Sequence, residues 1–352
     1  MSCELHQHYK SLILKKISLG FILIVLLGFV FILSISVGAI KIPFQDVVQS
    51  LFRIKTSNYE RIIWDLRLTR TVGAMLAGAG LGVAGAIMQN VLRNPLASPF
   101  TIGVSQGAAF GATFAIIVFG AGQMHMTGNE MVTIKTPYIV ALCAFIGSLL
   151  AVTTILLLST VRNITPESII LAGVAISAFF TASTMFLQYF ASDIQVAATV
   201  FWTFGDVGKA GWGENVYISI TLLSCLIYFI VKRWDYNAIQ WGDDVAKTLG
   251  VNIRFLRVSS LVLSSLIVSI ITSFVGIIGF IGLISPHIIR FIIGSDYRFL
   301  IPYSALFGGL LLSVSDIIAR TVLQPVTLPV GIITSFVGAP LFFFLLIKMR
   351  KI

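Results

Sequence analysis

The sequence predicts an all-α, multi-pass membrane protein with about ten transmembrane helices. Hydrophobic residues make up 57% of the 352-residue chain and charged residues only 11%, against about 25% charged in soluble domains. The mean hydropathy is +0.98. Apolar runs of roughly 20 residues recur along the whole length, which is enough to cross a ~30 Å hydrocarbon core as a helix that satisfies its own backbone hydrogen bonds.

The ten predicted spans follow one another along the whole chain. They are residues 17–39, 71–91, 100–120, 137–160, 168–190, 214–232, 258–276, 278–294, 302–319 and 329–347. The first run is too long for a secretory signal, whose apolar region has about 7–15 residues. Pro286 interrupts the short eighth run. We therefore expect a tail at residues 1–16 and a single transmembrane domain at residues 17–352.

The distribution of basic residues predicts the orientation. An even number of spans places both termini on one side, and we assign 15 of the 24 Lys and Arg residues to the segments on that side. The positive-inside rule then makes both termini cytoplasmic, in the cytoplasmic (inner) membrane. Basic loops that face anionic lipid headgroups explain the formal charge of +10, so no nucleic-acid partner is implied.

Small residues line the second span. Positions Gly80 to Gly85 spell the G-x-G-x-x-G dinucleotide motif, but that motif requires a preceding strand and an acidic residue about 20 positions later, and neither is present. Small residues also recur here at every fourth position, a pattern that lets a neighbouring helix approach closely. We therefore predict helix packing at Gly78, Gly82 and Gly85 and no nucleotide site.

Motifs for chemistry are missing from the sequence. It has no G-x-x-x-x-G-K-[ST] loop, so this chain does not hydrolyse ATP itself. No predicted span carries Asp, Glu or Lys near its middle, which disfavours an ion-coupled secondary transporter, although backbone carbonyls could still bind sodium. His287 stands alone without a second ligand nearby in sequence. We therefore predict no catalytic, cofactor-binding or metal residues in this chain.

The longest cytoplasmic connection covers residues 232–257. Gly242, followed by two aspartates, predicts a helix start with acidic side chains at the positive end of the helix dipole. Gly250 predicts the end of that helix, and a second short helix is expected from about Asn252 into the seventh span. The pattern alone leaves open two roles for this segment. It is either a solvated connector or the site at which the protein receives its energy input.

Four blocks of the sequence, residues 67–108, 241–251, 279–294 and 328–346, resemble the permease subunits of ABC importers for ferric siderophores, haem and cobalamin. The last three read WGDDVAKTLGV, GFIGLISPHIIRFIIG and LPVGIITSFVGAPLFFFLL. The resemblance implies a type II ABC importer permease that pairs with a second copy or a close paralogue. It also implies two ATPase subunits that bind the ATP and an extracytoplasmic substrate-binding protein.

The cargo implied by the resemblance is a metal chelate carried by alternating access. A ferric siderophore comes first, with haem or cobalamin as the alternative and an ion-coupled carrier less favoured. The segment 188–212 is expected to be an external loop that holds a short helix over the mouth of the path.

The resemblance further implies two sets of site residues. The loop matching 233–257 forms the coupling surface for the ATPases, and its matching positions are Trp241, Gly242, Asp243, Asp244, Ala246, Leu249 and Gly250. Arginines that pair with glutamates of the binding protein correspond to Arg67, Arg70 and Arg320. The planar arginine fork suits bidentate binding of a carboxylate. The alternative is that Arg320 merely pairs with nearby Asp316.

Overall fold

The structure, a computed structural model, describes residues 2–38, 42–51, 59–127, 129–134, 136–160, 166–324 and 326–349. The first half contains α1 (Ser2–Ser36), α2 (Phe44–Leu51), the π-helix η1 (Ile62–Leu68), α3 (Thr69–Val91), α4 (Val104–Val118), β1 (Gly122–Thr127), β2 (Asn129–Ile134) and α5 (Pro137–Thr160). The second half contains α6 (Pro166–Tyr189), α7 (Asp193–Thr203), the 3₁₀ turn η2 (Val207–Lys209), α8 (Trp212–Val231), α9 (Arg233–Gln240), α10 (Asp243–Thr248), α11 (Ile253–Val275), α12 (Ile281–Ile293), α13 (Tyr297–Thr321) and α14 (Val330–Met349).

The helical fold class predicted from composition is confirmed. Within the described residues, ten apolar helices coincide with the ten predicted spans, and seven of them are long and apolar enough to cross a bilayer. The other three, α4, α12 and the described part of α14, are shorter. Strands β1 and β2 pair antiparallel as a small hairpin between α4 and α5.

Several boundaries differ from the predicted ones. Helix α1 begins at Ser2, so the expected N-terminal tail continues the first span as one helix. Helix α12 runs through Pro286 without a break. A proline removes one backbone hydrogen bond from a helix, and α12 packs along both α3 and α13, which supports it from two sides. The predicted interruption at Pro286 is therefore wrong.

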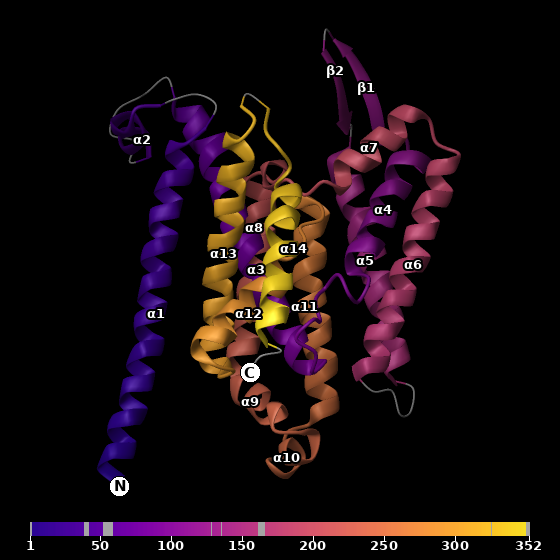
Figure 1. The fold of residues 1–352 in the computed structure, drawn as a ribbon. Coiled ribbons are helices and arrows are strands. Elements are labelled where there is room, and N and C mark those ends of the chain that lie inside the picture. Colours follow the sequence, from indigo (N-terminus) through magenta and orange to yellow (C-terminus); the bar gives the residue numbers. More distant parts are fainter. Residues whose placement is uncertain are drawn as a thin grey trace.

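Helix α3 lies at the centre of the larger helix cluster (Figure 1). It contacts α8, α11, α12 and α13, and most of its side chains are buried. Aliphatic side chains such as Leu81, Ile87 and Ile271 make the core between these helices. Helices α4, α5, α6 and α7 form a second cluster, joined to the first through contacts of α11 with α4 and α5.

Large apolar side chains cover much of the outside. Phe21 and Phe29 on α1, Phe179 on α6 and Ile227 on α8 are all more than half exposed. Such a surface is stable against lipid chains and not against water. These helix faces therefore contact the hydrocarbon core of the bilayer.

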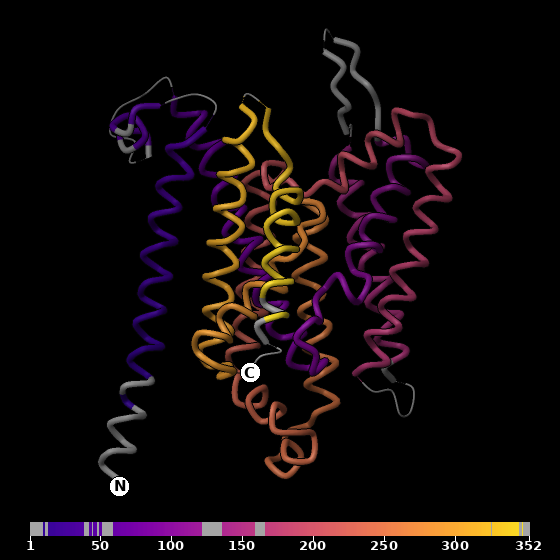
Figure 2. The backbone as a smooth tube through the Cα atoms, viewed as in Figure 1, coloured from indigo at the N-terminus to yellow at the C-terminus, as the bar shows by residue number. Residues whose placement is uncertain are grey.

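The first turn of α1 and the last turn of α14 lie towards the end of the bundle that carries α9 and α10, here named the α10 end (Figure 1). Helix α2 and the β1–β2 hairpin lie at the opposite end, the α2 end. Helices α9 and α10 protrude at the α10 end beyond α12 and α13 (Figure 2). This arrangement agrees with an even number of spans and gives the two termini one common side.

Candidate functional site

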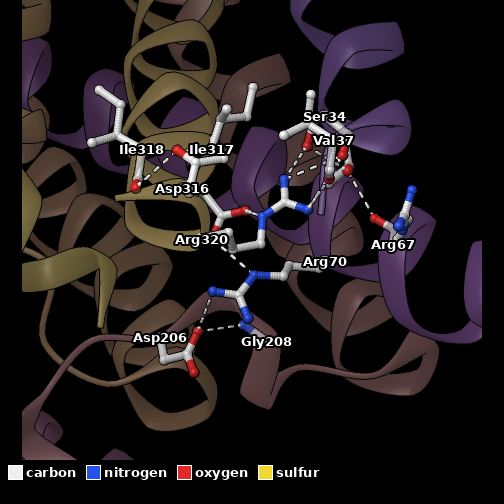
Figure 3. A network of polar contacts seen from close by, with 12 residues as sticks. Ser34, Val37, Arg67, Arg70, Asp206, Gly208, Asp316, Ile317, Ile318 and Arg320 are labelled. Atoms are coloured by element: carbon white, nitrogen blue, oxygen red, sulfur yellow. Dashed lines mark hydrogen bonds and ion pairs between the residues drawn. The ribbon is translucent and has the colours of Figure 1, made fainter. Parts of the chain in front are cut away.

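A cluster of buried charges occupies the α2 end, where α3, α13 and the loop after α7 meet (Figure 3). The Arg70 Nε donates to Asp316 Oδ1 at 2.8 Å, and its Nη2 lies 2.9 Å from Asp206 Oδ1. The Asp316 side chain is 0% exposed. Asp206 is held in turn by the backbone N–H of Gly208 at 2.9 Å. Arg70 therefore ties α13 and the η2 loop to α3.

The other two predicted docking arginines point towards the end of α1 (Figure 3). Arg320 pairs with Asp316 at 3.0 Å and donates to the Ser34 hydroxyl at 2.7 Å and the Val37 carbonyl at 3.1 Å. Arg67 donates to the carbonyls of Ile35 at 2.8 Å and Ser36 at 3.0 Å. The C-terminal carbonyls of a helix carry partial negative charge, which favours these cations.

The structure thus brings the three arginines together but turns them inward. Arg67 is 6% and Arg320 8% exposed, while the Arg70 side chain keeps 15%. A buried guanidinium must find acceptors within the protein, because an unpaired charge there is very costly. Asp316 and the last turn of α1 supply those acceptors. The pairing of Arg320 with Asp316, which the sequence left as an alternative, is present in the structure.

The loop after α6 contains a short helix, α7, as expected for residues 188–212. Ser192 caps its start by accepting from the Gln195 N–H at 3.4 Å. Lys209 closes its end, where the ammonium donates to the carbonyls of Phe201, Trp202 and Phe204 at 2.9–3.1 Å. Burial lowers the pKa of Lys209 to about 8.

The coupling segment, residues 233–257, folds as α9, α10 and the first turn of α11. Gly242 (φ +119°) and Gly250 (φ +81°) bracket α10, and both take backbone conformations that side chains disfavour. Asn252 caps α11 through the Phe255 N–H. The helix start and stop predicted at the two glycines are therefore present, whereas α9 was not predicted.

The predicted coupling residues divide into an exposed and an enclosed group. Trp241 is 80% and Leu249 67% exposed, and the Asp244 side chain is 99% exposed. Ala246, by contrast, is 0% exposed. An exposed tryptophan and leucine on a protruding element are the kind of side chains that pack against a partner protein.

Asp243 points back into the protein, where two arginines bind it. Arg93 Nη2 lies 2.6 Å from its Oδ1, and Arg257 Nη2 contacts both carboxylate oxygens at 2.9 and 3.1 Å. Arg257 also donates to the Val91 carbonyl at the end of α3 at 3.0 Å. The start of α10 is thereby fixed to both α3 and α11.

A second carboxylate, Asp296, connects α9 to α13. It caps α13 by accepting from the Arg298 N–H and accepts from the Asn237 amide of α9 at 3.2 Å. Burial by itself would raise the pKa of Asp296, but hydrogen bonds from Arg298 and Asn237 prevail and lower it to about 2. The carboxylate is therefore ionised at neutral pH.

The glycines predicted to pack helices lie at backbone-to-backbone contacts. A Cβ atom on Gly78 would collide with the Gly308 carbonyl of α13, and one on Gly82 with the Ser304 carbonyl. A Cβ on Gly85 would collide with the Gly282 carbonyl of α12. Because these residues have no side chain, α12 and α13 approach α3 closely.

A large cavity, of about 780 Å³, was not found by sequence reasoning. No charged side chain is among its lining residues in the part of the chain that the structure describes. The wall comes from four separate segments, represented by Thr101, Phe204, Phe280 and Ser335. Helix α3 is enclosed by its neighbours and contributes no lining residue to this cavity. The blocks at 67–108, 279–294 and 328–346 contain three of these segments, but their convergence is visible only in three dimensions.

Backbone contacts hold the irregular segments of this wall together. Phe204 and Ile277 form an isolated parallel bridge, and the Gly331 N–H donates to the Gly205 carbonyl at 3.0 Å. A Cβ on Gly205 would collide with the Ile277 carbonyl. Non-helical backbone at membrane depth is stable only where it is buried in protein or lines a cavity.

Together, these features define a polytopic helical membrane protein, with an uncharged cavity among its spans and a protruding helical segment at one end. The FecCD transport family matches residues 25–348, and the chain belongs to this family.

Individual relatives agree with that membership. A candidate ABC transporter permease of Methanocaldococcus jannaschii is 51% identical, with 99% of each chain covered. The hemin transport system permease of Yersinia pestis is 36% identical over 96% of this chain and 97% of its own. A solved structure, of a candidate metal-chelate type ABC transporter in an inward-facing conformation, is 28% identical with a TM-score of 0.78, covering 93% of this chain and 98% of that one. The chain is a transport subunit and not an enzyme.

Proposed function

We propose that this chain is the permease subunit of an ABC importer that moves a metal chelate inward by alternating access. The observation that supports this most is membership of a transport family over nearly the whole chain. A structural neighbour of the metal-chelate type and a hemin-transporting relative support the cargo class. The uncharged cavity of about 780 Å³ is of the size that holds small ligands.

The cargo proposed first is a ferric siderophore. Haem is the second candidate, because a relative 36% identical to this chain is named for hemin transport. Cobalamin is a third. A separate binding protein would carry most of the selectivity, so we infer the cargo class from the family and not from individual side chains of the cavity.

The partners follow from the same proposal. Two ATPase subunits would bind at the α10 end, where Trp241 and Leu249 are exposed. A second copy of the chain, or a close paralogue, would cover the face of α14 beside the cavity, where Phe336 is 76% exposed. The α10 end would be cytoplasmic and the membrane the cytoplasmic one, in agreement with the excess of basic residues assigned to that side.

A substrate-binding protein would dock at the α2 end. Arg67 and Arg320 already donate to groups of this chain, so we propose that they position α1, α3 and α13 at the docking face. Arg70 is the most exposed of the three and would be the arginine that meets a partner carboxylate.

The test is uptake of radiolabelled ferric siderophore, ferric citrate, haem and cobalamin by cells with and without this chain. Each assay is run with arsenate, which depletes ATP, and separately with a protonophore. We expect uptake of one cargo to depend on the chain and to stop with arsenate. Chain-dependent uptake that survives ATP depletion but stops with the protonophore would contradict the proposal and indicate an ion-coupled carrier.

A matched pair of variants adds a control for the coupling surface. Leu249→Arg places a charge on the exposed face of the coupling segment and should abolish uptake. Leu14→Arg alters an equally exposed leucine on α1 and should leave uptake near the wild-type level. Equal uptake by the two variants would contradict ATPase docking at Leu249.

A further inference from the structure

A second cavity, of about 450 Å³, opens near the α10 end. The side chains used here are Gln89, Asn90, Arg93, Gln240, Arg290 and Tyr297, all of which line it. It lies next to the large cavity, because the Gln89 amide donates to the Leu283 carbonyl at 3.4 Å and Leu283 lines the large cavity. The two cavities are therefore neighbours, and the second is the one lined by residues of the α10 end.

Positive charge is in excess around the second cavity. Arg290 donates to the Gln89 Oε1 at 2.8 Å, and no ion pair joins it to a carboxylate among the described residues. Arg93 shares the carboxylate of Asp243 with Arg257. Two arginines, Arg93 and Arg290, line this cavity, and no Asp or Glu is among its lining residues in the described part of the chain. Of the described residues that line the large cavity, none is charged.

Each of the two cavities is also lined by a residue with an unusual backbone conformation. Within the described chain, Arg93 (φ +47°) and Phe280 (φ +66°) are the two non-glycine residues with positive φ. Phe280 lines the large cavity and Arg93 the second one. Such conformations cost about 1–3 kcal/mol and tend to occur at functional sites. Asn90, which also lines the second cavity, has a buried Oδ1 for which the described residues supply no hydrogen-bond donor.

We propose that the second cavity is an anion-recognising exit of the transport path, and that the chain carries metal chelates with net negative charge and outward-facing carboxylate or catecholate oxygens. This inference rests on the proposed function and narrows its substrate class. Arg290 is the specificity residue, since its guanidinium keeps donors beyond the one that contacts Gln89. Arginine forks bind paired oxygens of this kind, and a cleft of one charge sign concentrates anions.

The experiment measures binding of two ⁵⁵Fe probes to the purified complex of permease and ATPases in nanodiscs, without binding protein. The probes are the anionic ferric citrate and a neutral ferric trihydroxamate. Arg290→Gln should weaken ferric citrate binding by about tenfold, as expected for a lost charged hydrogen bond, and change trihydroxamate binding less than twofold. Arg290→Lys keeps the charge and should recover most of the citrate binding.

Two controls keep the result specific. Lys15→Gln removes one positive charge from the exposed surface of α1 at the same end and should leave both affinities unchanged. Raising the ionic strength should weaken binding of citrate and not of trihydroxamate, because salt screens only the charged probe.

Equal losses for both probes in Arg290→Gln would overturn the inference, as would inhibition by inorganic phosphate at the concentrations at which citrate binds. Either result would still be compatible with ATP-dependent chelate uptake. Failure of this inference can therefore be distinguished from failure of the proposed function. That failure would show instead as uptake of no chelate, or as uptake independent of ATP.

Discussion

Replacement of Asp316 by alanine is the perturbation that the structure defines most closely. Its carboxylate is fully enclosed and holds two arginines, Arg70 on α3 at 2.8 Å and Arg320 on α13 at 3.0 Å. Removal of one partner from a buried ion pair typically costs about 3–5 kcal/mol, because it leaves a buried charge without compensation.

The structure places the expected cost at the lower end of that range. Arg320 would keep its bonds to Ser34 and Val37, and Arg70 would keep Asp206 at 2.9 Å. We therefore expect Asp316→Ala to destabilise the chain by about 3 kcal/mol, or roughly 5 °C in melting temperature for a chain of this size. Asp206→Asn, at a 31% exposed carboxylate, should cost about 1 kcal/mol or less.

The assay is thermal unfolding of the purified protein in detergent, followed by fluorescence-detected gel filtration, with uptake measured in parallel. If the arginine network positions α1, α3 and α13, the melting temperature and uptake should both fall in Asp316→Ala. If uptake is lost while the melting temperature of Asp316→Ala equals that of the wild type, the arginines act directly in docking and the positioning role is refuted.

Three further predictions concern other contacts. Gly85→Ala should destabilise the protein by about 1–3 kcal/mol, because its Cβ meets the Gly282 carbonyl, whereas Gly28→Ala has open space and should not lower the melting temperature. Asp243→Ala should lower the chelate transported per ATP hydrolysed in proteoliposomes, because it releases α10 from α3 and α11, and Asp244→Ala, at a 99% exposed side chain, should not. The folded pKa of Asp296, about 2, lies below its ordinary 3.8; its stabilisation should therefore be complete above about pH 4 and lost as pH falls towards 2. Asp296→Asn should flatten the plot of unfolding free energy against pH between about pH 4 and pH 2. An unchanged slope of that plot in the variant would contradict this role of Asp296.

Helix positions could be predicted because each membrane-spanning helix is nearly independent of the rest. A span satisfies its own backbone hydrogen bonds and needs a fixed apolar length, so both requirements are written in the local sequence. The same holds for α10, since Gly242 and Gly250 mark its limits through their own backbone freedom. Element boundaries were less well defined, as the extension of α1 to Ser2 shows.

Side-chain roles depended on distant partners. The charge of Arg67 pointed to a carboxylate on another protein, but its acceptors are carbonyls 31 and 32 residues earlier, at the end of α1. Asp243 was expected on the coupling surface, yet one of its partners, Arg93, is 150 residues away. Nothing in the local sequence around either residue specifies these neighbours.

The sequence by itself determined the membrane-spanning class, the approximate position of each helix, the small residues of α3 and the family. Only the tertiary structure decided that the arginines at the α2 end face inward, that Asp243 fixes α10, and where the two cavities lie. The physical reason is that apolar length and backbone satisfaction are local properties, whereas burial of a charge and closure of a cavity depend on which helices pack together.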